Sequence, residues 1–418
     1  ILFQKILSFL VYQISYTQPY FSNLIYNKYM TFEIEQVYCD NAATTPVNSE
    51  VLNEMLPYYS KSYGNPSGLY MLSQDSKAAI EFARDKIAKV INSKSSEVIF
   101  TSGGTESNNL AIKGLCLPVK DNSQNEIIIS TIEHHAVIHP AEQQKHIGYE
   151  VKYSNVNNEG MIDIENFKNL ITEKTKLISI MLANNEIGSV QDIRSLVEIV
   201  REKEKKFSNK IYFHTDAVQA IGKINVDVKT LGVDLLSISG HKFNAPKGVG
   251  ALYIKEDVVV EPLLDGGGQE RQNRSGTENV PSIVGLGKAI EIAEKDRESF
   301  FSHTKLLSEK FINDLKNFIP QVVLHSSSNG LPNIVNFSIP NIQGEPILIG
   351  LDFKGIMASS GSACSTASVE PSHVLLAKGV NDKLALGSVR LSFSLTNKIE
   401  EIEYITESLV DIYKELVN

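Results

Sequence analysis

A lysine and an aspartate, each following a short apolar segment, are the residues best placed to do chemistry. Lys242 follows the apolar run 233–238 and precedes the turn 244–248, whose proline and glycine cannot continue a helix. An amine in such a place is desolvated, which lowers its pKa and makes it nucleophilic toward an aldehyde. Asp216 ends another apolar segment, 211–214, where a carboxylate can keep a pyridinium nitrogen protonated. Although a lysine after a strand is more often a solvated loop charge, the pair favours pyridoxal phosphate as cofactor.

A glycine-containing segment follows a third apolar run and can bind phosphate. Residues 101–107 come directly after the run 98–100 and include Gly104 and Thr105. Backbone N–H groups and a hydroxyl at the start of a helix are suited to a phosphate group. An ordinary capped helix start would explain the same residues.

Three further polar residues follow predicted strands. His134 comes after the segment 126–130, where an imidazole can stack on an aromatic cofactor and transfer protons, although a lone histidine is more often simply packed. Asn185 follows the segment 177–182, and its amide can serve the phenolic oxygen of the cofactor or a substrate carboxylate. Gln219 can donate to the same ring oxygen. Each residue has an ordinary explanation, but their coincidence at successive strand ends favours a cofactor site.

A run of small residues, 358–368, contains one thiol, Cys364. Serine, glycine and alanine cannot bury a side chain in a core, so we expect a mobile loop whose thiol can reach and attack a substrate. Cys39 and Cys116 are expected to be inert packing residues. Arg390 lies on a short predicted strand, where a bidentate guanidinium suits the carboxylate of an amino acid.

The elements that position these residues alternate between apolar strands and helices. This alternation predicts an α/β domain with a mainly parallel sheet, which binds its ligand at the carboxyl ends of the strands. A long helix from 281 to 318 then leads to a smaller α+β section, 322–418, which ends in an amphipathic helix, 399–416. The polar segment 202–209 is expected to be a surface loop. The predicted strands are 98–100, 126–130, 177–182, 211–214, 235–239 and 250–254, and the predicted helices between them include 73–92 and 193–205.

Composition excludes several functions. A net charge of −9 gives no basic surface for nucleic acid or an anionic membrane. The 3 cysteines lack metal-ligand spacing and are odd in number, so we expect neither an intrinsic metal site nor a disulfide framework. The absence of a disulfide framework favours a reducing, cytoplasmic location. Residues 1–29 look like a leader or extension, which leaves an organellar location open; the apolar stretch 1–12 is too short to span a bilayer.

With these motifs in view, the chain from about Val37 to its C-terminus resembles the cysteine desulfurases of the NifS/IscS type. These are a branch of the class V aminotransferase-like, fold type I pyridoxal phosphate enzymes. The small-residue setting of Cys364 favours this branch over the SufS-like one, whose cysteine stands among Arg, Gly and His. The matching segments are 40–46, 64–67, those around Thr105 and Glu133–His134, 184–188, 239–242, 266–270, 274–277 and 359–364.

The resemblance implies a large cofactor-binding domain, 50–290, and a small domain built from 37–49 and 291–418, with 1–36 outside the core. It implies a homodimer that converts L-cysteine to L-alanine and passes sulfur, as a persulfide on the enzyme, to an acceptor such as an iron–sulfur scaffold. A selenocysteine lyase, a class V aminotransferase and a catalytically silent binding subunit remain as alternatives.

The resemblance also implies a role for each matching residue. Lys242 would bind the cofactor covalently and shuttle protons, Cys364 would attack sulfur and serve as a transient iron–sulfur ligand, and His134 would stack on the ring. The remaining roles are Asp216 at the pyridine nitrogen, Gln219 at the phenolic oxygen, Asn185 and Arg390 at the substrate carboxylate, and Gly104, Thr105, Ser239, His241 and the partner subunit's Thr277 at the phosphate.

Overall fold

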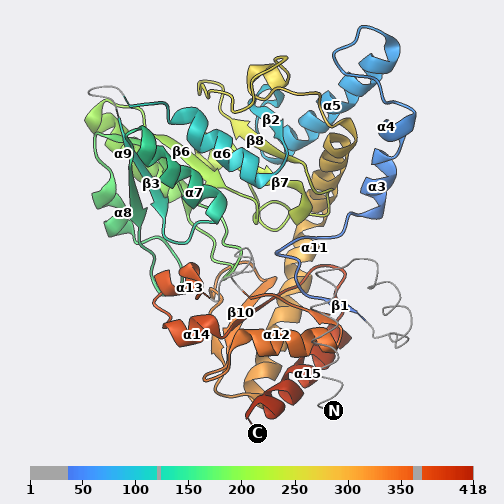
Figure 1. Cartoon of the computed structure of the whole chain (residues 1–418), viewed down its shortest axis with the longest axis vertical. Coiled ribbons are helices and arrows are strands. Elements are labelled where there is room, and N and C mark those ends of the chain that lie inside the picture. Colours follow the sequence, from blue (N-terminus) through green and yellow to red (C-terminus); the bar gives the residue numbers. More distant parts are fainter. Residues whose placement is uncertain (1–35, 120–123, 361–369, 418) are drawn as a thin grey trace.

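The computed structural model describes residues 36–119, 124–360 and 370–417. The predicted leader, apart from Gln36, and the segment around Cys364 lie outside these ranges. The described chain has two regions, one around a seven-stranded sheet and one around a three-stranded sheet, and helix α11 (Val280–Phe318) runs from the first into the second (Figure 1).

The seven-stranded sheet has the order β2-β8-β7-β6-β5-β3-β4. Its neighbouring strands are parallel except where β8 pairs with β2 and β7, so the predicted mainly parallel sheet is confirmed. The edge strand β4 escaped prediction because exposed residues interrupt its apolar pattern. The strands are β2 (Val98–Thr101), β3 (Glu126–Ser130), β4 (Glu150–Ser154), β5 (Thr175–Ser179), β6 (Tyr212–Asp216), β7 (Leu235–Ser239) and β8 (Gly250–Ile254).

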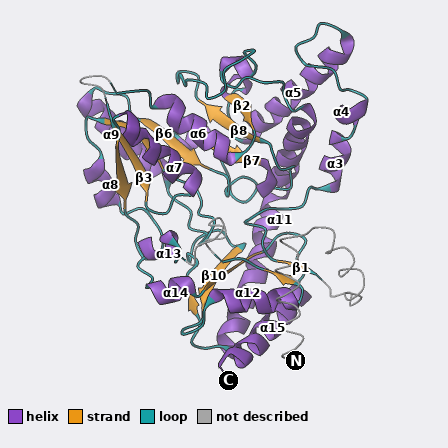
Figure 2. Ribbon diagram, viewed as in Figure 1, coloured by secondary structure: helices purple, strands orange, loops and turns teal. Residues whose placement is uncertain are grey.

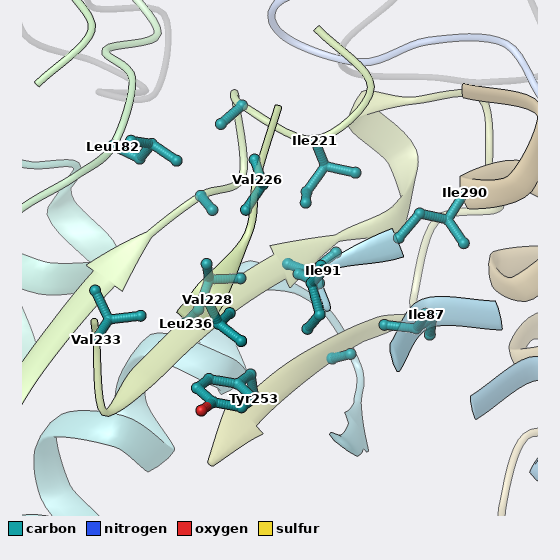
Figure 3. Close-up of a cluster of buried hydrophobic side chains, with 14 of the residues drawn as sticks. Ile87, Ile91, Leu182, Ile221, Val226, Val228, Val233, Leu236, Tyr253 and Ile290 are labelled. Carbon is teal, nitrogen blue, oxygen red and sulfur yellow. The ribbon is translucent and has the colours of Figure 1, made fainter. Parts of the chain in front are cut away.

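Helices cover both faces of this sheet because successive strand residues point to opposite sides (Figure 2). Ile128 of β3 faces the core shared with α5 (Met71–Val90), α9 (Ile193–Phe207) and α11. Ile127 packs on the other face with α6 (Gly104–Leu115) and α7 (His135–Gln143). In the first core, Ile87 of α5 and Ile91, which directly follows that helix, lie near Leu236 of β7 and Ile290 of α11 (Figure 3).

The smaller region contains β9 (Val323–Leu324), β10 (Ile334–Ser338) and β12 (Ser388–Ser392), all antiparallel. Helices α12 (Gly344–Phe353) and α15 (Ile399–Val417) and the end of α11 cover it, around the buried rings of Phe311, Phe337 and Phe393. Strand β1 (Val37–Tyr38) pairs with β11 (Ile356–Met357), so the first described residues belong to this region. The remaining α-helices are α3 (Ser49–Met55), α4 (Pro57–Ser60), α8 (Ile164–Leu170), α10 (Val228–Leu231), α13 (His373–Ala377) and α14 (Asp382–Leu386).

The polar segment 202–209 is helical through Phe207, so the predicted loop is wrong. Lysine and glutamate are good helix formers, and Glu204 accepts hydrogen bonds from Arg201 (2.9 Å) and the backbone N–H of Ile211 (2.7 Å), which hold this last turn in place. The predicted domain limits remain predictions, since α11 passes residue 290 without a break. In the described ranges, no helix has the length and apolar character needed to cross a bilayer.

Candidate active site

A cavity of about 540 Å³ lies at the carboxyl ends of the parallel strands. It collects every predicted site residue of the described ranges except Thr277, which is exposed elsewhere. Cys364 lies outside the described residues. The predicted residues that line the cavity are Gly104, Thr105, His134, Asn185, Asp216, Gln219, Ser239, His241, Lys242 and Arg390.

Lys242 enters the cavity from a short 3₁₀ turn, Gly240–Lys242, that follows β7. Its Nζ donates to the carbonyl oxygens of Ala42 (2.8 Å) and Ala43 (2.7 Å). A Cβ atom at Gly240 would lie 2.9 Å from both the Cβ of Ala245 and a methyl of Leu286, so only glycine lets the turn pack this closely. The amine is therefore held against the segment that follows β1.

Asp216 ends β6 with its carboxylate buried at the cavity wall. One oxygen accepts from the Asn108 amide (2.6 Å) and the other from the backbone N–H of Val218 (2.9 Å). Both donors are neutral, and no described cation forms an ion pair with Asp216, so the charge remains available to a cationic ring nitrogen. Sequence reasoning missed Asn108, which lies one turn after Thr105 on the inner face of α6.

The start of α6, where a phosphate site is predicted, has a glycine-containing turn and free backbone N–H groups. Gly103 has φ +151°, a value that favours glycine, and a Cβ on Gly104 would lie 2.8 Å from a Val218 methyl. The free N–H groups of this 12-residue helix point to its N-terminal end, where an anion is stabilised. Opposite, Nδ1 of His241 lies 3.1 Å from the Thr44 hydroxyl, and burial with nearby lysines lowers the pKa of His241 to about 4. This imidazole is therefore neutral at pH 7.

His134 lines the cavity and is the N-cap residue of α7. Its Nδ1 accepts a hydrogen bond from the backbone N–H of Ala136 (3.0 Å), so this nitrogen carries no proton. Burial lowers the pKa of His134, which favours a neutral ring at neutral pH. The preceding residue, Glu133, is fully buried, and burial raises its pKa to about 8. Sequence reasoning did not assign Glu133 a role.

Other histidines gather beside the cavity. The ring of His135 lies 4.9 Å from that of His139 and 5.1 Å from that of His373, which comes from the smaller region. Within the described ranges no group of His, Cys, Asp and Glu has the arrangement to hold a metal ion.

Arg390 reaches the cavity from β12 in the smaller region. Its two terminal nitrogens already donate to the Asp40 carboxylate (2.7 Å) and the Asn185 carbonyl (2.9 Å). A guanidinium has five N–H donors, so these two hydrogen bonds leave donors for the expected bidentate contact with a substrate carboxylate. One of these remaining donors is the buried Nε–H, which has no partner among the described residues. Asp40, which sets this arrangement, was not predicted as a site residue.

The segment before Thr277 is held in place by a buried carboxylate, that of Glu270. Residues Glu270 to Gln272 adopt three consecutive left-handed conformations, which are strained for residues other than glycine. Glu270 is buried and accepts from Arg84 (2.7 and 2.8 Å) and from the backbone N–H of Phe100 (2.8 Å). These contacts hold the segment against α5 and β2 while Thr277 remains exposed.

The side chains at the cavity match pyridoxal phosphate. An amine, an unpaired carboxylate, a neutral imidazole and a glycine-lined helix start correspond to the aldehyde, ring nitrogen, ring face and phosphate of that cofactor. The fold and this site define a fold type I, pyridoxal phosphate-dependent enzyme.

Comparison with known proteins assigns the family. The model of the Aminotransferase class-V family matches residues 37–405, and the chain belongs to this family. A relative named cysteine desulfurase IscS, from Clostridium botulinum, is 47% identical over 384 residues, which cover 91% of this chain and 95% of the relative. The predicted family, cofactor and enzyme class are confirmed.

Solved structures agree. A structure described as a NifS-like protein has a TM-score of 0.85 and 38% identity, and the match covers 91% of this chain and 99% of that one. A second, described as SspA in complex with cysteine, has a TM-score of 0.75 and 35% identity, and the match covers 86% of this chain and 99% of that one. The predicted fold class is therefore confirmed.

Proposed function

We propose that this chain is a cysteine desulfurase that converts L-cysteine to L-alanine and takes the sulfur onto Cys364 as a persulfide. The observation that carries the proposal is a single cavity that unites Lys242 and Asp216 with Asn185 and Arg390. The first pair suits the cofactor, and the second pair suits the carboxylate of a small amino acid. The relative from Clostridium botulinum described above is named for the same activity.

The described residues on either side of 361–369 support the role of Cys364. Ser359 exchanges backbone hydrogen bonds with Arg390 (3.2 and 2.7 Å). The Ser372 hydroxyl donates to Glu186 (2.5 Å), the neighbour of Asn185. Both flanks of the thiol-bearing segment are thus bonded beside the residues proposed to hold the substrate carboxylate.

Each side chain of the site has a separate role in the proposed reaction. Bound pyridoxal phosphate supplies an electron sink for the negative charge left at Cα of the substrate. Lys242 holds the cofactor and moves the Cα proton, and Asp216 keeps the ring nitrogen protonated. His134 packs on the ring face. The thiolate of Cys364 attacks the substrate sulfur, so an S–S bond forms as the substrate C–S bond breaks, and protonation of the remaining carbon gives alanine.

The assembly is proposed as well. Thr277 is exposed and its segment is braced by Glu270, which suits insertion into the phosphate site of a partner subunit in a homodimer. An iron–sulfur scaffold protein is the proposed sulfur acceptor, and a cytoplasmic location is proposed for the enzyme. The domain division at residues 50–290, with 37–49 and 291–418 as the second domain, completes the proposal.

Anaerobic incubation of the full-length holoenzyme with L-cysteine tests this function. We expect stoichiometric alanine and a gain of one sulfur atom on the peptide that contains Cys364, measured by mass spectrometry without reductant. Cys116→Ser is the matched control, because burial raises the pKa of Cys116 to about 12 and leaves an inert thiol. Added sulfur on Cys116, or alanine production that survives Cys364→Ser without added thiol, would overturn the proposal.

A further inference from the structure

A buried lysine with no role in the proposed mechanism lies behind Gln219. Lys223 is 5% exposed and follows Gln219 by four residues. Its Nζ donates to the side-chain oxygen Oε1 of Gln219 (2.7 Å) and to the backbone oxygen of the same residue (3.1 Å). Ile221, between the two, packs into the core next to the sheet, which anchors this segment (Figure 3).

The charge of Lys223 is poorly compensated. No described carboxylate forms an ion pair with its amine, and burial together with the positive charges of Lys242 and Arg390 lowers the pKa of Lys223 to about 7. A buried cation without a counterion destabilises a fold. The described hydrogen bonds of this amine both go to Gln219, so Gln219 is the residue that Lys223 can influence.

Lys223 fixes which end of the Gln219 amide faces the cavity. Below its pKa of about 7 the Lys223 amine is an ammonium, which is only a donor, so it selects the oxygen of the amide. The amide nitrogen, Nε2, then donates to the carbonyl oxygen of Ala42 (2.8 Å), the same oxygen that accepts from Lys242. A flipped amide would place Nε2 against the ammonium and Oε1 against the Ala42 oxygen, which are two repulsive contacts.

We propose that Lys223 is a positioning residue that orients the Gln219 amide, with the second N–H of Nε2 toward the phenolic oxygen of the cofactor. The inference rests on the role proposed for Gln219. Lys223 does not line the active-site cavity; it lines a second cavity, of about 360 Å³, which shares Lys242 with the first but does not include Gln219. We therefore expect Lys223 to affect the cofactor site through Gln219.

A double-mutant cycle on purified holoenzyme tests the proposal. The readouts are the pH midpoint of the visible absorbance band of the lysine-bound cofactor and the dissociation constant for pyridoxal phosphate. A donor at the phenolic oxygen stabilises negative charge there and so favours proton loss from the lysine linkage. Gln219→Leu should therefore raise the midpoint, by roughly one pH unit. Lys223→Met should raise it in the same direction, and the double variant should match Gln219→Leu alone.

Two further variants of Lys223 complete the design. Lys223→Arg restores a donor, for which the second cavity leaves room, and should return the midpoint to that of the wild type. Lys223→Gln has a side chain one bond shorter than lysine and should lose the contact with Gln219, so it should shift the midpoint as Lys223→Met does. It replaces Lys223→Met if that variant does not fold.

The matched control is Lys378→Met. Lys378 is a partly buried lysine that donates to the carbonyl of His325 in the smaller region, and its replacement should leave the midpoint unchanged.

The outcomes separate the two proposals. If Gln219→Leu shifts the midpoint while Lys223→Met and Lys223→Gln match the wild type, Lys223 does not orient the amide and this inference is overturned. If Gln219→Leu itself leaves the midpoint unchanged, the role proposed for Gln219 is wrong, and this inference fails with it. Additive shifts in the double variant would show that Lys223 acts independently of Gln219 and would also overturn it.

Discussion

Replacement of Glu133 by glutamine should change how the stability of the protein depends on pH. Glu133 is fully buried; one oxygen accepts from the backbone N–H of Met181 (2.9 Å) and from Ser130, and the other has no described partner. Burial raises its pKa from 4.5 to about 8, with a smaller contribution from the charge of Asp216. The carboxyl is therefore protonated in the folded protein at neutral pH, and Glu133→Gln keeps its shape without its proton equilibrium.

Proton linkage gives the sign and the size of this change in the free energy of unfolding. Because the folded pKa lies above the unfolded value, the stabilisation due to Glu133 is complete below the unfolded pKa and is lost as the pH rises toward the folded pKa. Between these values the free energy of unfolding of the wild type falls, relative to Glu133→Gln, by about 1.4 kcal/mol per pH unit. From pH 5 to pH 8 the difference amounts to roughly 4 kcal/mol.

Urea unfolding of both proteins, followed by circular dichroism at several pH values, measures this difference. Glu142→Gln, on the surface of α7, controls for the change from carboxyl to amide, since hydrogen bonds lower the pKa of Glu142 and its contribution should not fall with rising pH. Parallel curves for wild type and Glu133→Gln would refute the reasoning. Glu133 would then be ionised in the folded protein, beside His134 and Asp216.

The other predictions concern the cofactor, the thiol and the braced segment. Lys242→Ala should abolish alanine formation and let dialysis remove the cofactor, and turnover at the wild-type rate would show that another amine is catalytic. Asp216→Asn should lower turnover by about two or more orders of magnitude with a smaller loss of cofactor affinity, so unchanged turnover would place another residue at the ring nitrogen. Cys364→Ser should still bind cysteine and change the absorbance spectrum, but should show no persulfide in a mass spectrum. Glu270→Ala removes the buried carboxylate that pairs with the buried Arg84 guanidinium and should lower the free energy of unfolding by about 3–5 kcal/mol. Glu81→Ala removes only the half-exposed partner of Arg84 and should cost under about 1 kcal/mol, so equal losses in urea unfolding would contradict this.

Most of the active-site cavity was predictable because its chemistry sits at strand ends. A buried strand such as β7 is rich in apolar residues and carries no charge, and the charged residue that follows it, such as Lys242, stands out in the sequence. Parallel pairing then brings residues distant in the chain, such as Asp216 and Lys242, to one edge of the sheet. The strand β4 lacked this contrast, because it lies at an edge where burial is incomplete.

The supporting residues could not be predicted in the same way. Asn108 and Lys223 act through side-chain contacts to Asp216 and Gln219, and such contacts depend on packing rather than on a motif. Asp40 lies 350 positions from its partner Arg390, and no local pattern links them. The segment 202–209 was misjudged because a polar composition is shared by loops and by the outer face of a surface helix such as α9.

The continuous helix α11 has a consequence for substrate choice. Its 39 residues span about 58 Å, with the first part packed beside the large sheet and the last part in the core of the smaller region. Lys242 belongs to the first region and Arg390 to the second, so α11 acts as a rigid spacer between the amine and the guanidinium. A bend of about 5° at its midpoint would move its far end by about 2–3 Å, which exceeds the length of one methylene group. We therefore expect the stiffness of α11, a helix that does not line the active-site cavity, to contribute to discrimination between cysteine and a longer homologue, together with the direct hydrogen bond from Arg390 to Asn185.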